Sequence, residues 1–503
     1  MAGPGSQAKF VQGGLFRHVT VMALTSSIGL MAVFVVDLIN MIYIAWLGRA
    51  ELAAAIGYAG AILFFTTSFG IGMSIAVSAL VARALGQRDP DAARQKSTTG
   101  LVLGFGVGAV FAAAVWVFLS PLVTLLGATG ETHDLSVHFL RIVIPSQPLL
   151  MVGMIGGAIL RSHGDARAAM MATVWGALAT ALLDPILIFG LGWELTGAAL
   201  ASVAARVVIA AMALRPILSR YGGFDPVTRS MLAADLAPIF AIAVPAILTQ
   251  IATPVGQAFI TRATSAYGEA AVAGMAIAGR LTPVAFGVIF ALSGAIGPII
   301  GQNFGAGRMD RVRRAFLDGL IFTALVIAVV TAVLFLLRGP IADLFQAEGL
   351  TRDLVYLFCG PLALLWFFNG VIFVSNAVCN NLGRPFWSTV VNWGRHTVGT
   401  IPLALWLGSF WGAQGVLIGA GLGGVIFGGL AAWLALQAIL EGMPIELSSQ
   451  FHLAEDLMRA DEPHPPSVEI EMLAPLEQLD PILAAAEEFV RLAAQAGGSS
   501  PIS

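Results

Sequence analysis

The chain has 503 residues, of which 58% are hydrophobic and 11% are charged, and its mean hydropathy is +0.87. A soluble domain carries about 25% charged residues, so this composition excludes a soluble globular protein and indicates a chain that crosses a membrane many times. The net charge of −3 is unevenly divided. Residues 441–503 hold twelve acids and two bases, a net charge of −10, so the preceding 440 residues carry +7.

Long apolar runs predict the spanning helices, each of which needs about 20 apolar residues to cross a bilayer. Twelve runs are long enough, with approximate limits of 19–47, 51–85, 97–119, 134–160, 167–192, 196–216, 236–265, 268–303, 311–337, 352–380, 385–409 and 413–440. Several exceed the length that a bilayer requires, so we expect these helices to tilt, bend or project beyond it.

The loops between these runs alternate in charge, which predicts the orientation of the chain. Arginine-rich loops follow every second span, at 82–96, 161–167, 215–229 and 307–314. The alternate loops, such as 127–134, 190–197 and 408–415, contain no arginine. Because basic loops stay in the cytoplasm, the first set and both termini are predicted to be cytoplasmic. We therefore expect a multi-pass protein of the cell inner membrane.

These limits divide the chain into five predicted parts. They are a cytoplasmic N-terminus (1–18), an N-terminal six-helix lobe (19–216), a cytoplasmic interlobe linker (217–235), a C-terminal six-helix lobe (236–440) and an acidic cytoplasmic tail (441–503). The apolar pattern within the tail predicts an acidic amphipathic helix.

An internal repeat predicts how the lobes are related. Three pairs of segments align at an offset of 219 residues, namely 82–95 with 301–314, 130–134 with 349–353, and 160–167 with 379–386. Each half holds an even number of spans, so an axis along the membrane normal relates the two. The predicted fold is an all-α polytopic membrane protein with twelve transmembrane helices in two lobes of pseudo-two-fold symmetry. Lobes that rock around a shared cavity are the alternating-access layout of a transporter.

Several of these segments also resemble a known family. The stretches "VDLINMIYIAWLGRAELAAA" (36–55), "ILRSHGDARAAM" (159–170), "LDPILIFGLGWELTGAALAS" (183–202) and "GQNFGAGRMDR" (301–311) are similar to signatures of the multidrug and toxic compound extrusion (MATE) transporters. The resemblance covers roughly residues 15–440 in the correct order. It implies antiport of drug-like molecules against a coupling cation, either H⁺ or Na⁺.

The distribution of acids resembles one branch of that family. The DinF-like branch concentrates its functional acids in the first and fifth spans, and here Asp37 lies in span 1 and Asp184 in span 5. Spans 7, 11 and 12 contain no acid, and the acids of spans 8 and 10, Glu269 and Asp353, lie at the second position of their spans. Where the branch has an asparagine one helical turn before the span-5 aspartate, this chain has Thr180.

Asp37 and Asp184 are also the acids placed deepest in the predicted spans. At 1.5 Å per residue from the arginine-rich side, they lie about 27 Å and about 25 Å along their helices. The two carboxylates are therefore predicted at similar depth in one lobe. An ionised aspartate facing lipid at the centre of a span costs about 2.5–3.5 kcal/mol, so each must face a cavity, find a partner or bind a proton.

Three polar side chains are predicted to complete an ion-coupling site with the two acids. Asn40 lies one turn beyond Asp37, Thr180 lies one turn before Asp184, and Ser202 enters from span 6. Burial and a neighbouring carboxylate both favour the protonated form of a carboxyl group, so such a pair can hold a proton and release it later. The same oxygens can instead ligate Na⁺ at Asp37 and Asp184, and the sequence leaves both ions open.

A purely structural interpretation competes with the coupling site. In it, Asp184 bonds Arg141 or a hydroxyl of span 6 and only holds helices together. Pro185 is predicted to kink span 5 and to free a backbone carbonyl near the site, and a kink without a role in transport is the alternative.

Five residues are predicted to line the substrate cavity: Met41, Gln250, Gln257, Arg206 and Asn376. Arg206, near mid-depth in the lobe that holds both acids, is the best candidate for a functional partner. For the amides, interhelical hydrogen bonds are the alternative. For the other arginines within spans, Arg141, Arg280 and Arg395, helix packing or a place at the membrane interface is favoured, and contact with substrate or with an acid is the alternative.

The predicted function is export of drug-like, often cationic, organic molecules against an inward proton flux by alternating access. A Na⁺-coupled antiporter and a flippase for lipid-linked precursors are the alternatives. The only GxGxxG-like run, at 419–424, lies inside an apolar span, and no Walker lysine loop is present, so neither nucleotide binding nor ATP-driven transport is expected. We expect no enzymatic activity, no cofactor beyond the coupling ion, no nucleic-acid partner, contact with membrane lipid and a monomeric transport unit.

Overall fold

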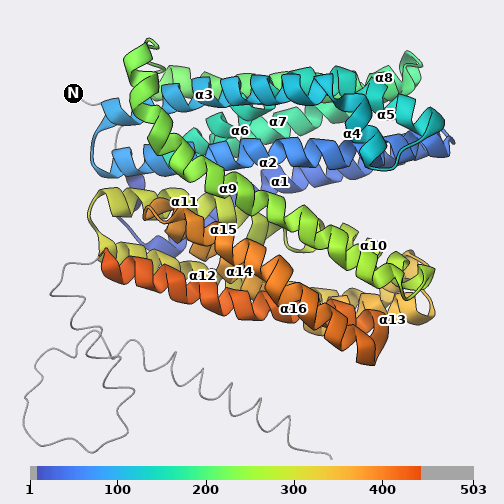
Figure 1. Ribbon diagram of the computed structural model, residues 1–503. Helices are drawn as coiled ribbons and strands as arrows, with labels where there is room; N and C mark the ends of the chain where they lie inside the picture. Colours follow the sequence, from blue (N-terminus) through green and yellow to red (C-terminus); the bar gives the residue numbers. More distant parts are fainter. Residues whose placement is uncertain (1–7, 443–503) are drawn as a thin grey trace, which may run out of the picture. The chain divides into compact units, whose positions relative to one another are not determined.

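The computed structural model describes residues 8–442, and helices account for nearly all of that range (Figure 1). The first half contains η1 (Lys9–Val11), α1 (Leu15–Trp46), α2 (Ala50–Gly86), α3 (Pro90–Val117), α4 (Leu119–Leu125), α5 (Gly130–Val143), η2 (Ile144–Ser146), α6 (Gln147–Ser162), α7 (Ala166–Pro185), η3 (Ile186–Gly190) and α8 (Glu194–Arg220). The second half contains α9 (Arg229–Ser265), α10 (Glu269–Ala285), α11 (Gly287–Gly305), α12 (Met309–Leu344), α13 (Gly349–Leu357), η4 (Phe358–Leu362), α14 (Ala363–Asn381), α15 (Pro385–Gly394), η5 (Arg395–Gly399) and α16 (Thr400–Glu441).

The predicted parts can be placed on these helices. We call α1–α8 the N-lobe and α9–α16 the C-lobe. The predicted linker over 217–235 is shorter in the structure, because α8 continues to Arg220 and α9 begins at Arg229. Thr228 starts α9 by accepting a bond from the Met231 backbone N–H through its hydroxyl. The predicted acidic tail lies outside the described residues beyond position 442.

The twelve predicted spans are confirmed. Eleven helical stretches of the described chain are long and apolar enough to cross a membrane, and the last of them, Pro385–Glu441, is 57 residues long. This stretch doubles back at Gly412, whose φ of 58° is a left-handed conformation that glycine adopts without strain. A Cβ on Gly415 would lie 2.1 Å from the Leu407 carbonyl oxygen, so the two arms pack directly against each other. The hairpin therefore counts as two spans.

The internal repeat is visible in the backbone as well as in the sequence. Residues with positive φ recur at the offset of 219 residues: Arg88 with Gly307, Gly127 with Gln346, Gly130 with Gly349, and Gly164 with Gly383. Each pair occupies equivalent turns between spans. The matching left-handed turns show that the two lobes share one backbone arrangement, as the predicted pseudo-two-fold symmetry requires.

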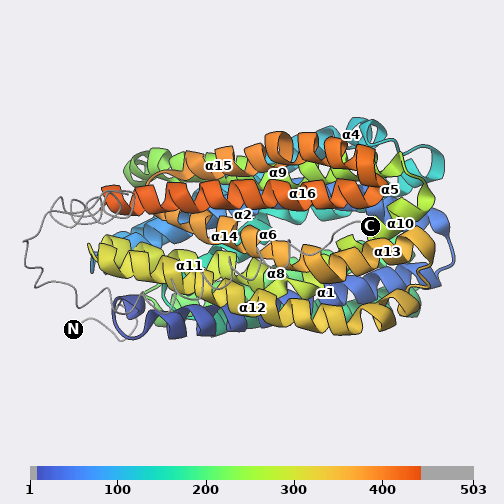
Figure 2. The same cartoon turned by 90° about the horizontal axis from the view of Figure 1, so that it is seen from below.

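The two lobes are joined at one end only. We call this the joined end; it carries the turns at 86–90, 162–166, 305–309 and 381–385. There, α1 runs beside α11 and α12 (Figure 2), and one apolar cluster combines Val19 and Met22 of the N-lobe with Leu292 and Ile299 of the C-lobe. At the opposite, far end the apolar clusters each belong to a single lobe. The helices of the two lobes diverge toward that end (Figure 1).

Hydrogen bonds across the joined end obey the same pseudo-symmetry. Arg83 donates from Nη2 to the carbonyl oxygen of Asn381 at 2.6 Å, and Gln302 donates from Nε2 to the carbonyl oxygen of Ser162 at 2.7 Å. Arg83 and Gln302 are separated by the repeat offset, as are Ser162 and Asn381. Each lobe therefore closes on the other through an equivalent donor and an equivalent helix end.

Backbone contact makes the joint close. A Cβ on Gly86 would lie 2.1 Å from the Gln302 carbonyl oxygen, and one on its repeat partner Gly305 would lie 2.1 Å from the Arg83 carbonyl oxygen. No side chain fits at either position without moving a backbone, so glycine is required for α2 and α11 to approach this closely.

Candidate functional site

The structure places Asp184 in a closed site between α1 and α7. Its side chain is 0% exposed, and its Oδ2 accepts a hydrogen bond from Asn40 Nδ2 at 2.7 Å. The Oδ1 atom is buried and has no hydrogen-bond partner among the described residues. An ionised carboxylate with one unsatisfied oxygen is costly in such surroundings, so this oxygen is suited to take up a proton or a cation.

Asp37 belongs to the same site but is in a different environment. It lies on α1, one helical turn before Asn40, and its side chain is exposed. Asp37 is therefore accessible, whereas Asp184 is buried. The Asn40 amide, one helical turn beyond Asp37, donates a hydrogen bond to Asp184.

The backbone beside Asp184 is irregular for a local reason. Pro185 has no N–H to donate, and α7 ends there and continues as a π-helical turn over Ile186–Gly190. Gly197 of α8 packs against this turn, because its Cβ would lie 2.7 Å from the Leu187 carbonyl carbon. The proline thus changes the helix type beside the carboxylate, and π-helical turns of this kind are frequent at functional sites.

Two predicted members of the coupling site do not bond Asp184 in this structure. Thr180 Oγ1 donates to the Gly176 carbonyl oxygen at 3.3 Å, and Ser202 Oγ donates to the Ala198 carbonyl oxygen at 3.0 Å. Both hydroxyls satisfy their own helices and keep lone pairs that can accept. Their participation in ion binding stays a prediction.

Arg206 does not join the acids either. Its guanidinium, 8% exposed, donates from Nη1 to the Val143 carbonyl oxygen at 3.0 Å and to Ser146 Oγ at 2.8 Å. These acceptors lie where α5 ends and α6 begins, in a break that contains Pro145. Arg206 therefore holds together the two segments of the fourth span, and its predicted place in the substrate cavity has no contact here to support it.

We expect Arg206→Gln to destabilise the fold while leaving substrate selectivity unchanged. The substitution leaves a buried carbonyl or hydroxyl without its donor, which costs about 1–3 kcal/mol. The melting temperature of purified protein in detergent should fall for Arg206→Gln and stay unchanged for Arg141→Gln, because Arg141 is exposed. Unchanged stability together with altered substrate preference would instead support the cavity role.

The other predicted cavity residues are spread over three helices. Met41 is exposed on α1, Gln257 is exposed on α9, and Gln250 of α9 is half-buried. Asn376 of α14 accepts a hydrogen bond at Oδ1 from Asn392 Nδ2, 3.4 Å away. The structure therefore brings Asn376 into a polar group of the C-lobe and leaves it apart from the acids of the N-lobe.

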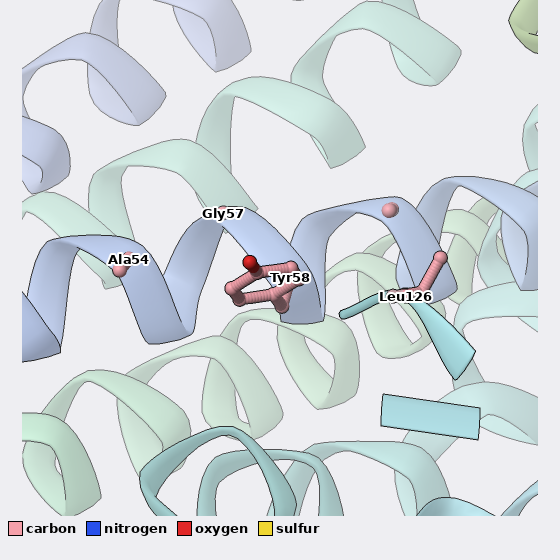
Figure 3. A pocket seen from close by; sticks show the side chains of 5 residues that line it. Ala54, Gly57, Tyr58 and Leu126 are labelled. Carbon is pink, nitrogen blue, oxygen red and sulfur yellow. The ribbon is translucent and has the colours of Figure 1, made fainter. Parts of the chain in front are cut away.

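A shallow hollow at the far end contains none of the predicted residues. It has a volume of about 350 Å³ and is lined by Ala54, Gly57, Tyr58, Ala61 and Leu126 (Figure 3). Its lining is apolar apart from the Tyr58 hydroxyl, so it offers no group that could couple an ion.

The residues that bond across the joined end, Arg83 and Gln302, were not among the functional candidates predicted from the sequence. Arg83 and Gln302 lie in the very segments that reveal the repeat, and their common offset marked them as equivalent. Their role depends on which helix ends face them across the lobes, and the repeat offset alone does not specify that.

Comparisons with known proteins identify the family. The family model described as MatE matches residues 26–186 and 245–406, one stretch in each lobe. An "FAD transporter" of Shewanella oneidensis is 29% identical over 84% of this chain and 94% of its own length. The "Multidrug export protein MepA" of Staphylococcus haemolyticus is 23% identical over 81% of this chain and 90% of its own length.

Solved structures show the same fold. A mutant of the Vibrio cholerae MATE transporter VcmN superposes with a TM-score of 0.81 at 24% identity, covering 85% of this chain and 98% of that one. An outward-facing MATE transporter of the MOP superfamily also reaches 0.81 at 21% identity, covering 88% and 99%. The resemblance first seen in the sequence motifs is thereby confirmed: the chain belongs to the MatE family.

Proposed function

We propose that this chain is a secondary active exporter that moves drug-like organic molecules out of the cell in exchange for protons. The observation that carries the proposal is the buried Asp184 carboxyl group, with one oxygen bonded to Asn40 and the other unpartnered. The exposed Asp37 beside it supplies a route for protons. Family membership and the names of relatives such as MepA support export of organic molecules.

The arrangement of the lobes supports alternating access. By the positive-inside rule, the arginine-rich joined end faces the cytoplasm, which makes both termini cytoplasmic in a cell inner membrane. The structure then corresponds to an outward-facing state. For the cycle to proceed, the symmetric bonds of Arg83 and Gln302 must break while the lobes approach each other at the far end.

Proton binding would drive this exchange through Asp184. A neutral, protonated Asp184 can remain buried without the cost of an unpaired charge, whereas the ionised form favours a hydrated site. Protonation from outside would therefore favour the closed arrangement around α1 and α7, and loss of the proton inside would reset it. The assignment to the DinF-like branch is consistent with this use of Asp37 and Asp184 and is part of the proposal.

Gradient-driven efflux from proteoliposomes tests the proposal. With ethidium loaded inside vesicles, a pH gradient alone, acidic outside, should drive its export by the reconstituted chain. A Na⁺ gradient alone, with the higher concentration outside, should not. Protein-free vesicles under the same gradients are the control. Export driven by Na⁺ alone would mean that the same acids bind Na⁺, and export under neither gradient would contradict a coupled exporter.

A flavin nucleotide is the second candidate substrate. The relative with 29% identity over most of both chains is named an FAD transporter, and FAD is an anion. The same vesicles loaded with FAD distinguish the two candidates by which compound leaves. In either case we propose that the chain carries out no chemical conversion, needs only its coupling ion and acts as a monomer in contact with lipid.

A further inference from the structure

The C-lobe contains a buried arginine at mid-depth. Arg395 begins the π-helical turn η5 and is 7% exposed. The span starts at Pro385, so Arg395 lies about 15 Å along it at 1.5 Å per residue, near the middle of a bilayer. An arginine there is expensive unless its charge is matched, and such residues mark substrate or ion pathways.

Every partner that the structure gives Arg395 is neutral. Its Nη1 donates to Asn369 Oδ1 on α14, and its Nη2 donates to His396 Nε2 at 2.7 Å. Arginine can only donate, so His396 Nε2 carries no proton and the imidazole adds no positive charge. The Nε atom of Arg395 is buried without a partner, and no carboxylate within residues 8–442 pairs with this guanidinium.

One amide, that of Asn369, contacts the guanidinium, and two more lie farther along the same helices. Asn369 and Asn376 are seven residues apart on one face of α14, and Asn392 lies one turn before Arg395. The Oδ1 atoms of Asn369 and Asn376 both accept hydrogen bonds, so their Nδ2 atoms remain available as donors. His396 packs against Gly256 of α9, where a Cβ would lie 2.1 Å from Nδ1. The site therefore lies where α9, α14 and η5 meet.

Two other arginines of the described chain, Arg83 and Arg161, also have a buried Nε without a hydrogen-bond partner, and both lie near the turns of the joined end. Arg206 is bonded to a carbonyl and a hydroxyl of its own lobe. Asp318 pairs with Arg314 at 3.0 Å, and the buried Asp235 pairs with Lys96, both near the joined end. Arg395 differs from Arg83 and Arg161 by its place at mid-depth of its span, and it has neutral hydrogen-bond partners and a free buried donor.

We propose that Arg395, together with the Nδ2 donor of Asn369, forms a subsite for a negatively charged group of the transported molecule, a carboxylate or a phosphate. A planar guanidinium with an unoccupied donor matches the geometry of such an oxyanion. The inference rests on the proposed transport function and adds that transported molecules with a carboxylate or a phosphate gain binding energy at this subsite, whereas cations such as ethidium do not use it. It also separates the two tasks, because the anion binds in the C-lobe while the coupling acids lie in the N-lobe.

Flavin mononucleotide and riboflavin test the subsite, because they share a fluorescent ring system and differ by one phosphate. We expect the purified full chain to bind flavin mononucleotide about tenfold or more tightly than riboflavin. Arg395→Gln should remove that preference and leave riboflavin binding unchanged. Arg395→Lys keeps the positive charge but loses the paired N–H donors of the guanidinium, so it should retain part of the preference for flavin mononucleotide. Arg280→Gln, which changes an exposed arginine of the same lobe, is the matched control.

Each outcome bears on the proposal. Equal binding of the two flavins by the wild type, binding of neither, or a preference that survives Arg395→Gln overturns it. A structural role of Arg395 in the π turn would weaken both flavins alike. If Arg395→Gln fails to yield monodisperse protein, the preference for flavin mononucleotide over riboflavin is compared between Arg395→Lys and Arg280→Gln. An equal preference in these two variants overturns the proposal. Failure of gradient-driven efflux by the wild type would count against the transport function while leaving the binding result readable.

Discussion

Asp184→Asn is expected to reduce proton-coupled export to the level of protein-free vesicles while leaving the chain folded. The asparagine has nearly the same shape and its carbonyl oxygen can still accept the hydrogen bond from Asn40. It cannot exchange a proton, and it removes the charge whose burial we propose to drive the cycle. The side chain at position 184 would then be neutral at every pH, so an imposed pH gradient could not change its protonation.

Efflux driven by an imposed pH gradient measures this effect, with substrate binding measured in parallel. Asp353→Asn is the control, because Asp353 is an exposed acid of the far end in the other lobe. Coupled export by Asp184→Asn at the wild-type rate would show that Asp184 only holds α1 and α7 together. Loss of the melting transition would contradict the expectation that the variant stays folded, because it would mean that the carboxylate is needed for folding.

Gly86→Ala is expected to open the joined end and to slow transport. The new Cβ would lie 2.1 Å from the Gln302 carbonyl oxygen, a backbone atom that cannot turn away. Overpacking of this kind costs about 1–3 kcal/mol, which weakens the joined arrangement about 5- to 150-fold relative to the open one. A transporter that cannot close at this end should leak or stall.

Hydrogen–deuterium exchange reports the opening directly. Exchange should rise in residues 158–166 and 299–308, which meet across the joint, and efflux should fall. Gly60→Ala is the matched control on the same helix, because a Cβ there meets no atom within 4 Å. Equal exchange in the two variants would mean that α2 and α11 accommodate the methyl group without parting.

Hydrophobicity was sufficient to predict the spans and lobes, whereas side-chain partners depended on packing. The prediction placed Asn40 beside Asp37, since one helical turn separates them. In the structure the Asn40 amide bonds Asp184, 144 residues away, because α1 is rotated toward α7. A one-dimensional pattern contains no information on that rotation.

Arg206 illustrates the same limit. Its depth in the span suggested a functional charge, whereas the structure shows a break at Ile144–Ser146 in the fourth span. The sequence does not show that the break exposes the Val143 carbonyl directly opposite Arg206. By contrast, the repeat offset did specify which residues of the two lobes are equivalent, and the positive φ values recur in register with it.

The short segment before α1 sets a limit on the motion of the lobes. The Phe10 peptide is held by the C-lobe, through its N–H to Gln302 Oε1 at 2.9 Å and its carbonyl oxygen to Asn303 and Arg311. Only the residues from Phe10 to Leu15 connect that anchor to α1, and fully extended they reach about 18 Å. While the anchor holds, the start of α1 can move no farther than that from α11 and α12. The N-terminal segment is thus a tether that limits how far the two lobes can separate at this end while its anchor holds.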